Sequence, residues 1–206
     1  MQTAFPIGTT SLDEFCAQHR KVALAFSGGC DSSYLLSALM DRGVQVKAYL
    51  VVSAFLYPFE RIDALRLASE LEADVEVIEV DILSQEEVCT NAHDRCYSCK
   101  SVIFGTIKNH MARDGFEVLV DGTNADDSPE RRPGFRALAK LGILSPLRLA
   151  GLSKEEVRNA SRKRSLFTWD KPNFSCLATK IEQGTPITAA RLSEVLKREG
   201  YEDGTT

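Results

Sequence analysis

The sequence KVALAFSGGCDSS, residues 21–33, contains the pattern from which most of the fold can be predicted. Its first part, Lys21 to Phe26, is a short apolar run and predicts a buried strand. Ser27-Gly28-Gly29 predicts a tight turn, and the residues that follow have the apolar spacing of a helix. A strand that turns abruptly into a helix presents free N–H groups at the helix start, and such a turn is suited to bind phosphate.

Strand-like and helix-like segments alternate through the first part of the chain. The other predicted strands are Val46–Val52, Val75–Val80 and Val118–Val120, and the predicted helices between them are Asp31–Arg42, Glu60–Leu71 and Lys100–Ala112. This alternation predicts an α/β fold, a Rossmann-like parallel sheet with helices on both faces. After Asp121 the pattern becomes mainly helical, over Glu130–Leu141, Ser153–Lys163 and Thr188–Glu199. We therefore expect an α/β domain over residues 1–128 and a short, mainly helical C-terminal segment over residues 129–206.

The loop from Ser27 to Ser33 carries the groups that a nucleotide needs. Its glycines let the backbone approach an anion, its serines add hydroxyl donors, and Asp31 can hold Mg²⁺ beside the phosphates. The chain has neither a GxxxxGK[ST] loop nor a GxGxxG fingerprint. Ligands of parallel sheets bind beyond the carboxyl ends of the strands, so the loops after strands one, two and four should contribute. The predicted ATP-binding residues are Ala25, Ser27, Gly28, Gly29, Asp31, Ser32, Ser33, Val52, Ser53, Gly122, Thr123 and Asn124.

Composition and charge argue against several classes of protein. The chain has 206 residues and a formal net charge of -4, whereas proteins that bind a long phosphate backbone are usually basic, so we expect no nucleic-acid partner. The longest apolar stretch, Val44 to Phe59, is interrupted by polar residues, and Met1 to Thr10 shows no secretory signal. We therefore expect no membrane association and a cytoplasmic enzyme whose six cysteines are reduced thiols or ligands.

Further motifs narrow the choice of family. They are Cys96-Tyr97-Ser98-Cys99-Lys100, Asp121 to Asp127 (DGTNADD), Arg132-Pro133-Gly134 and Lys171 to Ala178 (KPNFSCLA). The loop from Ser27 to Ser33 resembles that of the PP-loop ATP pyrophosphatases, which have the adenine nucleotide alpha-hydrolase-like fold and cleave ATP between its α- and β-phosphates. With these motifs, the chain resembles the ATP-dependent sulfur transferases of the LarE family from about Phe15 to Leu196. That family helps to make the nickel-pincer cofactor.

The resemblance implies a small-molecule substrate, a pyridinium dicarboxylic acid mononucleotide, and a homo-oligomeric enzyme. A carboxylate oxygen of this substrate would attack the α-phosphorus of ATP, with Asp31 and Mg²⁺ at the phosphates. Cys176 would then displace AMP to form a thioester, and in the sacrificial version its C–S bond breaks and leaves dehydroalanine. The reaction needs a thiolate, which the basic neighbours Lys171 and Lys180 are expected to favour.

Cys96 and Cys99 leave the source of the sulfur open. Together with Cys176 they could hold a [4Fe-4S] cluster with one iron free to bind an extra sulfide, as the resemblance to some family members implies. Zinc is an alternative, because the same stretch offers four ligands at short spacing, namely Cys89, His93, Cys96 and Cys99. The third alternative is that these thiols bind no metal.

Two other functions stay open on the sequence alone. One is another PP-loop adenylating ligase or a tRNA thiolase, and the other is a nucleotide-binding module that has lost catalysis. Members of the family usually continue past the position of Tyr201 into a strand with phosphate-binding arginines, whereas this sequence ends at Thr206. We therefore expect the helical segment to be shortened relative to the family, which weakens the substrate assignment more than the ATP assignment.

Overall fold

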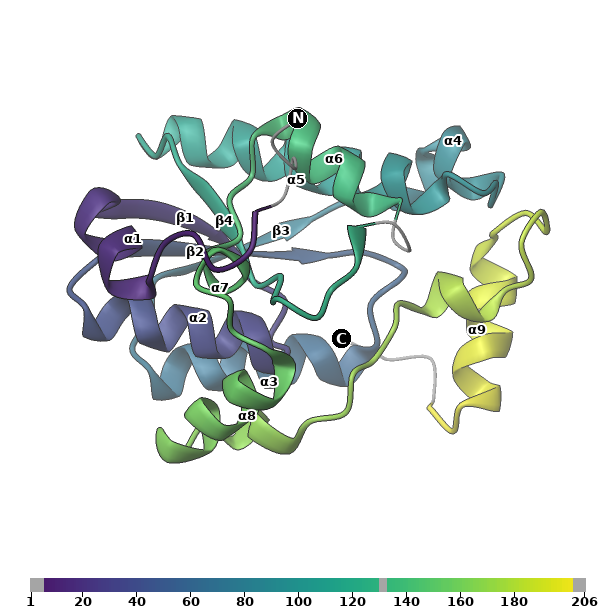
Figure 1. Cartoon of the computed structure of the whole chain (residues 1–206). Helices are drawn as coiled ribbons and strands as arrows, with labels where there is room; N and C mark the ends of the chain where they lie inside the picture. The colour runs from purple at the N-terminus through teal and green to yellow at the C-terminus, as the bar shows by residue number, and fades with distance from the viewer. Residues whose placement is uncertain (1–5, 130–132, 202–206) are drawn as a thin grey trace.

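A computed structural model of the chain describes residues 6–129 and 133–201. At its centre lies one sheet of 4 parallel strands in the spatial order β3-β2-β1-β4 (Figure 1). The strands are β1 (Lys21–Ala25), β2 (Gln45–Val52), β3 (Val75–Glu79) and β4 (Leu119–Asp121). The strand order changes direction between β1 and β4, and in such sheets the ligand crevice lies beyond the carboxyl ends of the strands at that point. The predicted α/β fold is confirmed.

The sheet is covered on both faces, which explains why its central strand is an uninterrupted apolar run. The covering helices are α2 (Cys30–Asp41), α3 (Pro58–Glu70), α5 (Arg95–Arg113) and α6 (Gly134–Leu141). Val22 and Leu24 of β1 are buried in the cluster that contains α2 and α3 residues. Ala23 points the other way and is buried with Phe104 and Leu138 under α5 and α6. Figure 1 shows these two helical layers on opposite faces of the sheet.

The remaining helical elements surround this body or extend from it. They are α1 (Leu12–Gln18), η1 (Ile82–Ser84), α4 (Glu86–Cys89), α7 (Pro146–Leu149), α8 (Lys154–Lys163), η3 (Phe167–Asp170), η4 (Leu177–Lys180) and α9 (Ala189–Arg198). A separate core cluster joins η1, α4, η4 and α9, and we call these elements the side lobe. Figure 1 shows α9 at one end of the molecule, away from the sheet. In the described ranges, no helix has the length and apolar character needed to span a membrane.

The helix that carries two of the candidate ligands starts earlier than predicted. α5 begins at Arg95 rather than at Lys100, so Cys96 and Cys99 lie in its first turns and not in a loop. The predicted helix over residues 130–141 lies partly outside the described residues, as does Arg132 of the Arg132-Pro133-Gly134 motif, and α6 is described from Gly134.

α8 begins as predicted and packs on the body of the sheet. The Ser153 hydroxyl accepts a hydrogen bond from the Glu156 N–H, and the Glu156 carboxylate accepts one from the Ser153 N–H, so a capping box fixes the start of this helix. Val157 of α8 and the later Leu166 are buried in the same cluster as Leu24. Part of the chain after residue 128 thus shares the core of β1, and the division at that residue stays a prediction.

Candidate active site

A cavity of about 670 Å³ opens at the carboxyl ends of β1, β2 and β4. Most of the predicted ATP-binding residues line it, namely Ala25, Ser27, Gly29, Asp31, Ser32, Ser53, Gly122, Thr123 and Asn124. Gly28, Ser33 and Val52 do not reach its surface. The opposite part of the wall comes from α5, with Cys99, and from the segment before η4, with Cys176. One cavity therefore joins the phosphate loop to two of the candidate thiols.

The phosphate loop is held in shape by its own serines. The Ser27 and Ser32 hydroxyl oxygens are 3.0 Å apart, and the Ser32 hydroxyl also donates to the Gly29 carbonyl at 3.2 Å. Gly29 is the N-cap of α2 and has extended backbone, so the first N–H groups of this helix are free to face a ligand. At the end of β4, Gly122 lies so near the phosphate loop that an added Cβ would be 2.8 Å from the Ser32 nitrogen. This close approach lets the loops after β1 and β4 form one continuous wall.

Gly28 is expected to be the most sensitive glycine of the loop. Its φ is +68°, and an added Cβ would lie 2.5 Å from the Ala64 Cβ on α3. Gly28→Ala should therefore combine a left-handed backbone with overpacking and lower the free energy of unfolding by about 3 kcal/mol. Gly142→Ala is the matched control, because Gly142 has φ +65° but nothing within 4 Å of the added Cβ, so it should cost only about 1 kcal/mol. Urea unfolding measures the free energy of unfolding of both variants, and an equal loss in the two would contradict the packing argument.

Asp31 has one carboxylate oxygen bound and one free. Oδ2 accepts from Lys154 Nζ at 2.5 Å, and Oδ1 is buried with no hydrogen-bond partner among the described residues. The Ser33 hydroxyl is also buried without a partner in that part of the chain. Lys154 is the first residue of α8, and its backbone N–H donates to Asp126 Oδ2 at 2.8 Å. A lysine from α8 is thus held between the phosphate loop and the loop after β4.

The loop after β4 is rigidly braced. Asp121 is buried, and its two oxygens accept from the Ser145 and Thr123 hydroxyls, each at 2.6 Å. The buried Arg148 donates to the backbone carbonyls of Asn124 and Asp127. These contacts occupy the polar groups behind the loop, so that Gly122, Thr123 and Asn124 keep a fixed position in the cavity wall.

The three candidate sulfur ligands lie on two elements and share one cation. Cys96 and Cys99 are three residues apart on α5 and therefore lie on the same side of this helix. The Arg95 guanidinium donates to the Ala178 carbonyl at 2.6 Å and to Cys96 Sγ at 3.4 Å, so it links α5 to the segment that carries Cys176. Cys96 does not line the cavity that contains the phosphate loop; it lines a second cavity of about 540 Å³. The thiols thus lie where the sheet body meets the side lobe.

Burial favours the protonated form of two of the thiols, Cys99 and Cys176, by raising their pKa. Burial, together with the neighbouring Cys176 and Cys96, raises the pKa of the Cys99 thiol to about 12. Burial also raises the pKa of Cys176, and the Arg95 charge lowers it only in part. The expectation that Lys171 and Lys180 favour the thiolate is wrong, because these lysines pair with Asp63 at 2.8 Å and with Glu199 at 3.1 Å.

The zinc alternative is not supported by the arrangement of its ligands. Cys89 Sγ donates to the Leu83 carbonyl at 3.2 Å, and the His93 side chain is 80% exposed beside Asp94. Within residues 6–129 and 133–201, no three His, Cys, Asp or Glu side chains are grouped so that they could hold one metal ion. The Cys96, Cys99 and Cys176 thiols remain close enough to influence one another electrostatically, as the pKa of Cys99 shows.

Sequence patterns missed Lys154 as a residue of the site. The helical pattern predicts where α8 begins, but Lys154 and Asp31 are 123 residues apart in the chain, and no local pattern relates them. Arg95 was missed for a similar reason, since its link to Ala178 spans 83 residues. Phe174, which lines the cavity two residues before Cys176, lies within the motif Lys171 to Ala178, but the sequence pattern assigns it no role.

Comparisons with known proteins agree with this geometry. An uncharacterized protein of Synechocystis sp. is 32% identical over 192 residues, which are 93% of this chain and 72% of that protein. The pyridinium-3,5-bisthiocarboxylic acid mononucleotide synthase of Lactiplantibacillus plantarum is 29% identical over 184 residues, 88% of this chain and 67% of the enzyme. The solved structure of NMN synthetase from Francisella tularensis has a similar fold, with a TM-score of 0.62 at 16% identity over 94% of this chain and 84% of that chain. No protein-family model matches the chain.

Proposed function

The chain belongs to the LarE-like PP-loop ATP pyrophosphatases, as an ATP-dependent sulfur transferase that adenylates its acceptor, and we propose that the acceptor is a carboxylate of a pyridinium mononucleotide. The observation that carries the proposal is the single cavity that connects the phosphate loop to the Cys176 thiol. The Lactiplantibacillus plantarum relative, a pyridinium-3,5-bisthiocarboxylic acid mononucleotide synthase, supports the choice of acceptor.

In this proposal, the ATP phosphates lie against the start of α2. The free N–H groups after Gly29 and the Ser27 and Ser32 hydroxyls would bind them. The unpartnered Asp31 Oδ1 is an oxygen ligand of the kind that Mg²⁺ prefers, so the residues present fit this ion. When bound, Mg²⁺ would neutralise charge on the departing pyrophosphate. Adenine and ribose would lie near Ser53 and the residues Gly122 to Asn124, since Val52 is not part of the cavity wall.

The first chemical step is adenylation. A carboxylate oxygen of the acceptor attacks the α-phosphorus, the bond from this phosphorus to the bridging oxygen breaks, and pyrophosphate leaves. The product is an acyl adenylate, whose carbonyl carbon is open to a nucleophile. The phosphate loop orients the triphosphate for this step, and the Cys176 sulfur is not required for it.

The second step is sulfur transfer. The Cys176 thiolate attacks the acyl carbon, and AMP leaves, which gives a thioester. Removal of the Cys176 α-proton then breaks the Cβ–S bond, so that the acceptor leaves as a thiocarboxylate and the protein keeps dehydroalanine. The alternative source is a [4Fe-4S] cluster, whose ligands would be Cys96, Cys99 and Cys176. Within the described residues these thiols are not grouped to hold a single metal ion, and a cluster held by them would supply a sulfide that is not part of the polypeptide.

Assembly and location follow from the same proposal. We expect a cytoplasmic homo-oligomer that acts on a small nucleotide and has no nucleic-acid partner. The formal net charge of -4 supports the last of these expectations.

The test is turnover of a defined acceptor. The protein, Mg-ATP and pyridinium-3,5-dicarboxylic acid mononucleotide should release pyrophosphate and give a product in which one oxygen is replaced by sulfur, as measured by mass spectrometry. Nicotinamide mononucleotide, which carries one amide and no ring carboxylate, is the control and should release none, because it lacks the attacking carboxylate. Pyrophosphate release without any sulfur-containing product would favour another adenylating ligase, and no release would refute the proposal.

A further inference from the structure

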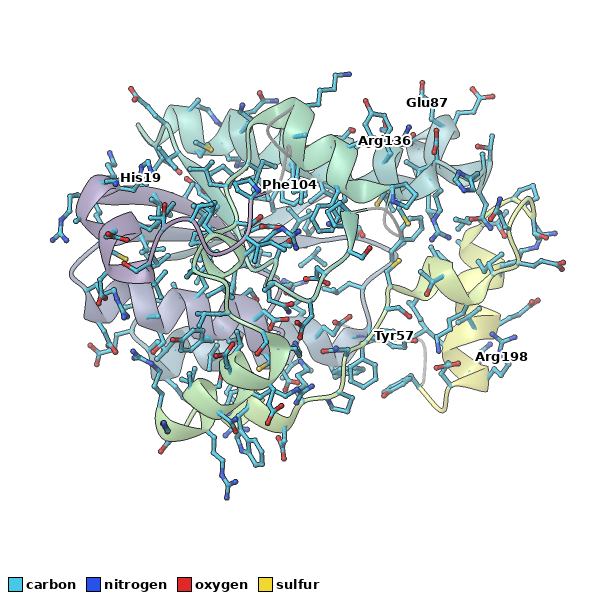
Figure 2. The ribbon with its side chains drawn as sticks, viewed as in Figure 1. His19, Tyr57, Glu87, Phe104, Arg136 and Arg198 are labelled. Atoms are coloured by element: carbon cyan, nitrogen blue, oxygen red, sulfur yellow. The ribbon has the colours of Figure 1, made fainter. Side chains whose placement is uncertain are left out.

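A group of aromatic side chains lies at the edge of the candidate active site. The Phe59 and Phe174 ring centroids are 4.8 Å apart in an edge arrangement, and the Phe59 and Tyr201 rings are stacked at 5.2 Å. Tyr57 contacts the same three rings and is buried. These residues come from the start of α3, the segment before Cys176 and the end of the described chain. Figure 2 shows Tyr57 at the end of α3 that faces the side lobe.

Phe174 differs from the other large apolar residues at the surface. It is 40% exposed, and the other exposed large apolar residues in the described ranges are Ile7, Ile62 and Leu65. Of these, only Phe174 lines the cavity. Its ring is held at one side by Phe59 and Tyr57, so it does not need to order on binding. An exposed, preorganised aromatic ring in the wall of a cavity is a common element of ligand sites.

The Phe174 ring can accept a cation on its face. Lys171 Nζ lies 5.3 Å from the Phe59 ring centroid and pairs with Asp63, so Phe59 already has a cation over it. Within the part of the chain that the structure describes, no cation lies over Phe174. Glu60 lines the same cavity, and its carboxylate accepts from the backbone N–H of Tyr57, which touches Phe174. A flat, positively charged ring would therefore find both an aromatic face and a nearby carboxylate.

We propose that Phe174 is the stacking platform for the cationic heteroaromatic ring of the acceptor. The proposal rests on the proposed function and adds the residue that selects the ring. Phe174 is two residues before Cys176, so a ring stacked on it has its carboxyl substituent beside the thiol that receives the acyl group. An uncharged aromatic carboxylic acid would lose the cation–π contribution and bind less tightly.

The competing role for Phe174 is to stack the adenine of ATP. The two roles differ in which Michaelis constant changes. Phe174→Leu keeps an apolar side chain but removes the π-face, and it should raise the KM for the pyridinium acceptor about tenfold while the KM for ATP stays unchanged. Phe174→Tyr should restore the acceptor KM. Ile62→Ala on α3, which removes an exposed apolar residue outside the cavity, is the matched control and should change neither constant.

A binding measurement without turnover completes the test. The chain contains one tryptophan, Trp169, so Phe174→Trp adds a second emitter in the cavity. Its additional emission should be quenched by the acceptor alone and not by Mg-ATP alone, whereas the wild type should show no quenching by the acceptor. If wild-type enzyme does not turn over the acceptor, the proposed function fails. If the wild type turns the acceptor over, three results would refute the platform alone. Phe174→Leu could keep a normal acceptor KM or raise the ATP KM, or the emission of Phe174→Trp could stay unquenched by the acceptor.

Discussion

Replacing Cys176 with alanine should leave the first-turnover release of pyrophosphate close to that of the wild type and lower thiocarboxylate formation by about a thousandfold or more. The reason is that the two steps use different parts of one cavity. The phosphate loop lies at the carboxyl end of β1, whereas Cys176 lies on the segment that leads into the side lobe. A quenched-flow measurement of pyrophosphate with mass analysis of the acceptor separates the two steps.

Cys89→Ala is the control for this prediction. Cys89 Sγ donates a hydrogen bond to the Leu83 carbonyl and does not line the cavity, so its loss should leave both steps intact. Sulfur transfer that survives in Cys176→Ala would refute both versions of the sulfur source.

The mass of the protein after turnover separates the two versions. A sacrificial Cys176 leaves the polypeptide lighter by one H₂S, whereas sulfur from a cluster leaves its mass unchanged. In the cluster version, anaerobically purified protein should be brown and contain iron and sulfide, and Cys96→Ala or Cys99→Ala should bleach it while adenylation persists. Colourless protein without iron whose mass stays unchanged after several turnovers would contradict both.

Replacing Asp31 with alanine should lower pyrophosphate release by about a thousandfold. Asp31 is the only carboxylate inside the predicted phosphate loop, and its Oδ1 is the free, buried oxygen that fits Mg²⁺. The melting temperature should change little, because the α2 start is shaped by Gly29 and the serine hydroxyls rather than by this side chain. Calorimetric titration with Mg-ATP should show weakened binding.

Asp13→Ala is the matched control for Asp31. The Asp13 side chain is 81% exposed and forms a surface ion pair with Arg42 at 2.6 Å, away from the cavity wall. Its removal should leave pyrophosphate release unchanged, since exposed pairs contribute little. Normal release by Asp31→Ala would mean that the assignment of the phosphate loop is wrong.

The sheet could be predicted because its signals are local. A buried parallel strand must be apolar throughout, and the run from Lys21 to Phe26 shows this without any partner being known. The phosphate loop could be predicted for the same reason, because backbone freedom at Gly28 and hydroxyls at Ser27 and Ser32 act within a few residues. The expectation that Cys99 and Cys176 belong to the site came from a family resemblance rather than from physics, and both line the same cavity as the loop.

The electrostatics of the site could not be predicted in this way. Which lysine faces which carboxylate depends on how α8 packs on α2, and the contact between Lys154 and Asp31 exists only in the folded chain. The thiol environment was misjudged because Lys171 is near Cys176 in sequence, whereas the cation that acts on the thiol is Arg95 from α5. Burial then outweighs this charge, and burial is a property of the whole packing.

The ion pair between Lys154 and Asp31 has a consequence for how charge is delivered to ATP. In the nucleotide-free protein, the ammonium group acts as a resident counterion for the phosphate loop. A divalent cation on the free Oδ1 would leave Lys154 paired with Oδ2, and the backbone of this lysine stays anchored to Asp126. Under the proposed function, the triphosphate would thus meet two sources of positive charge. Without a ligand, the Asp31 carboxylate meanwhile keeps one cation beside it.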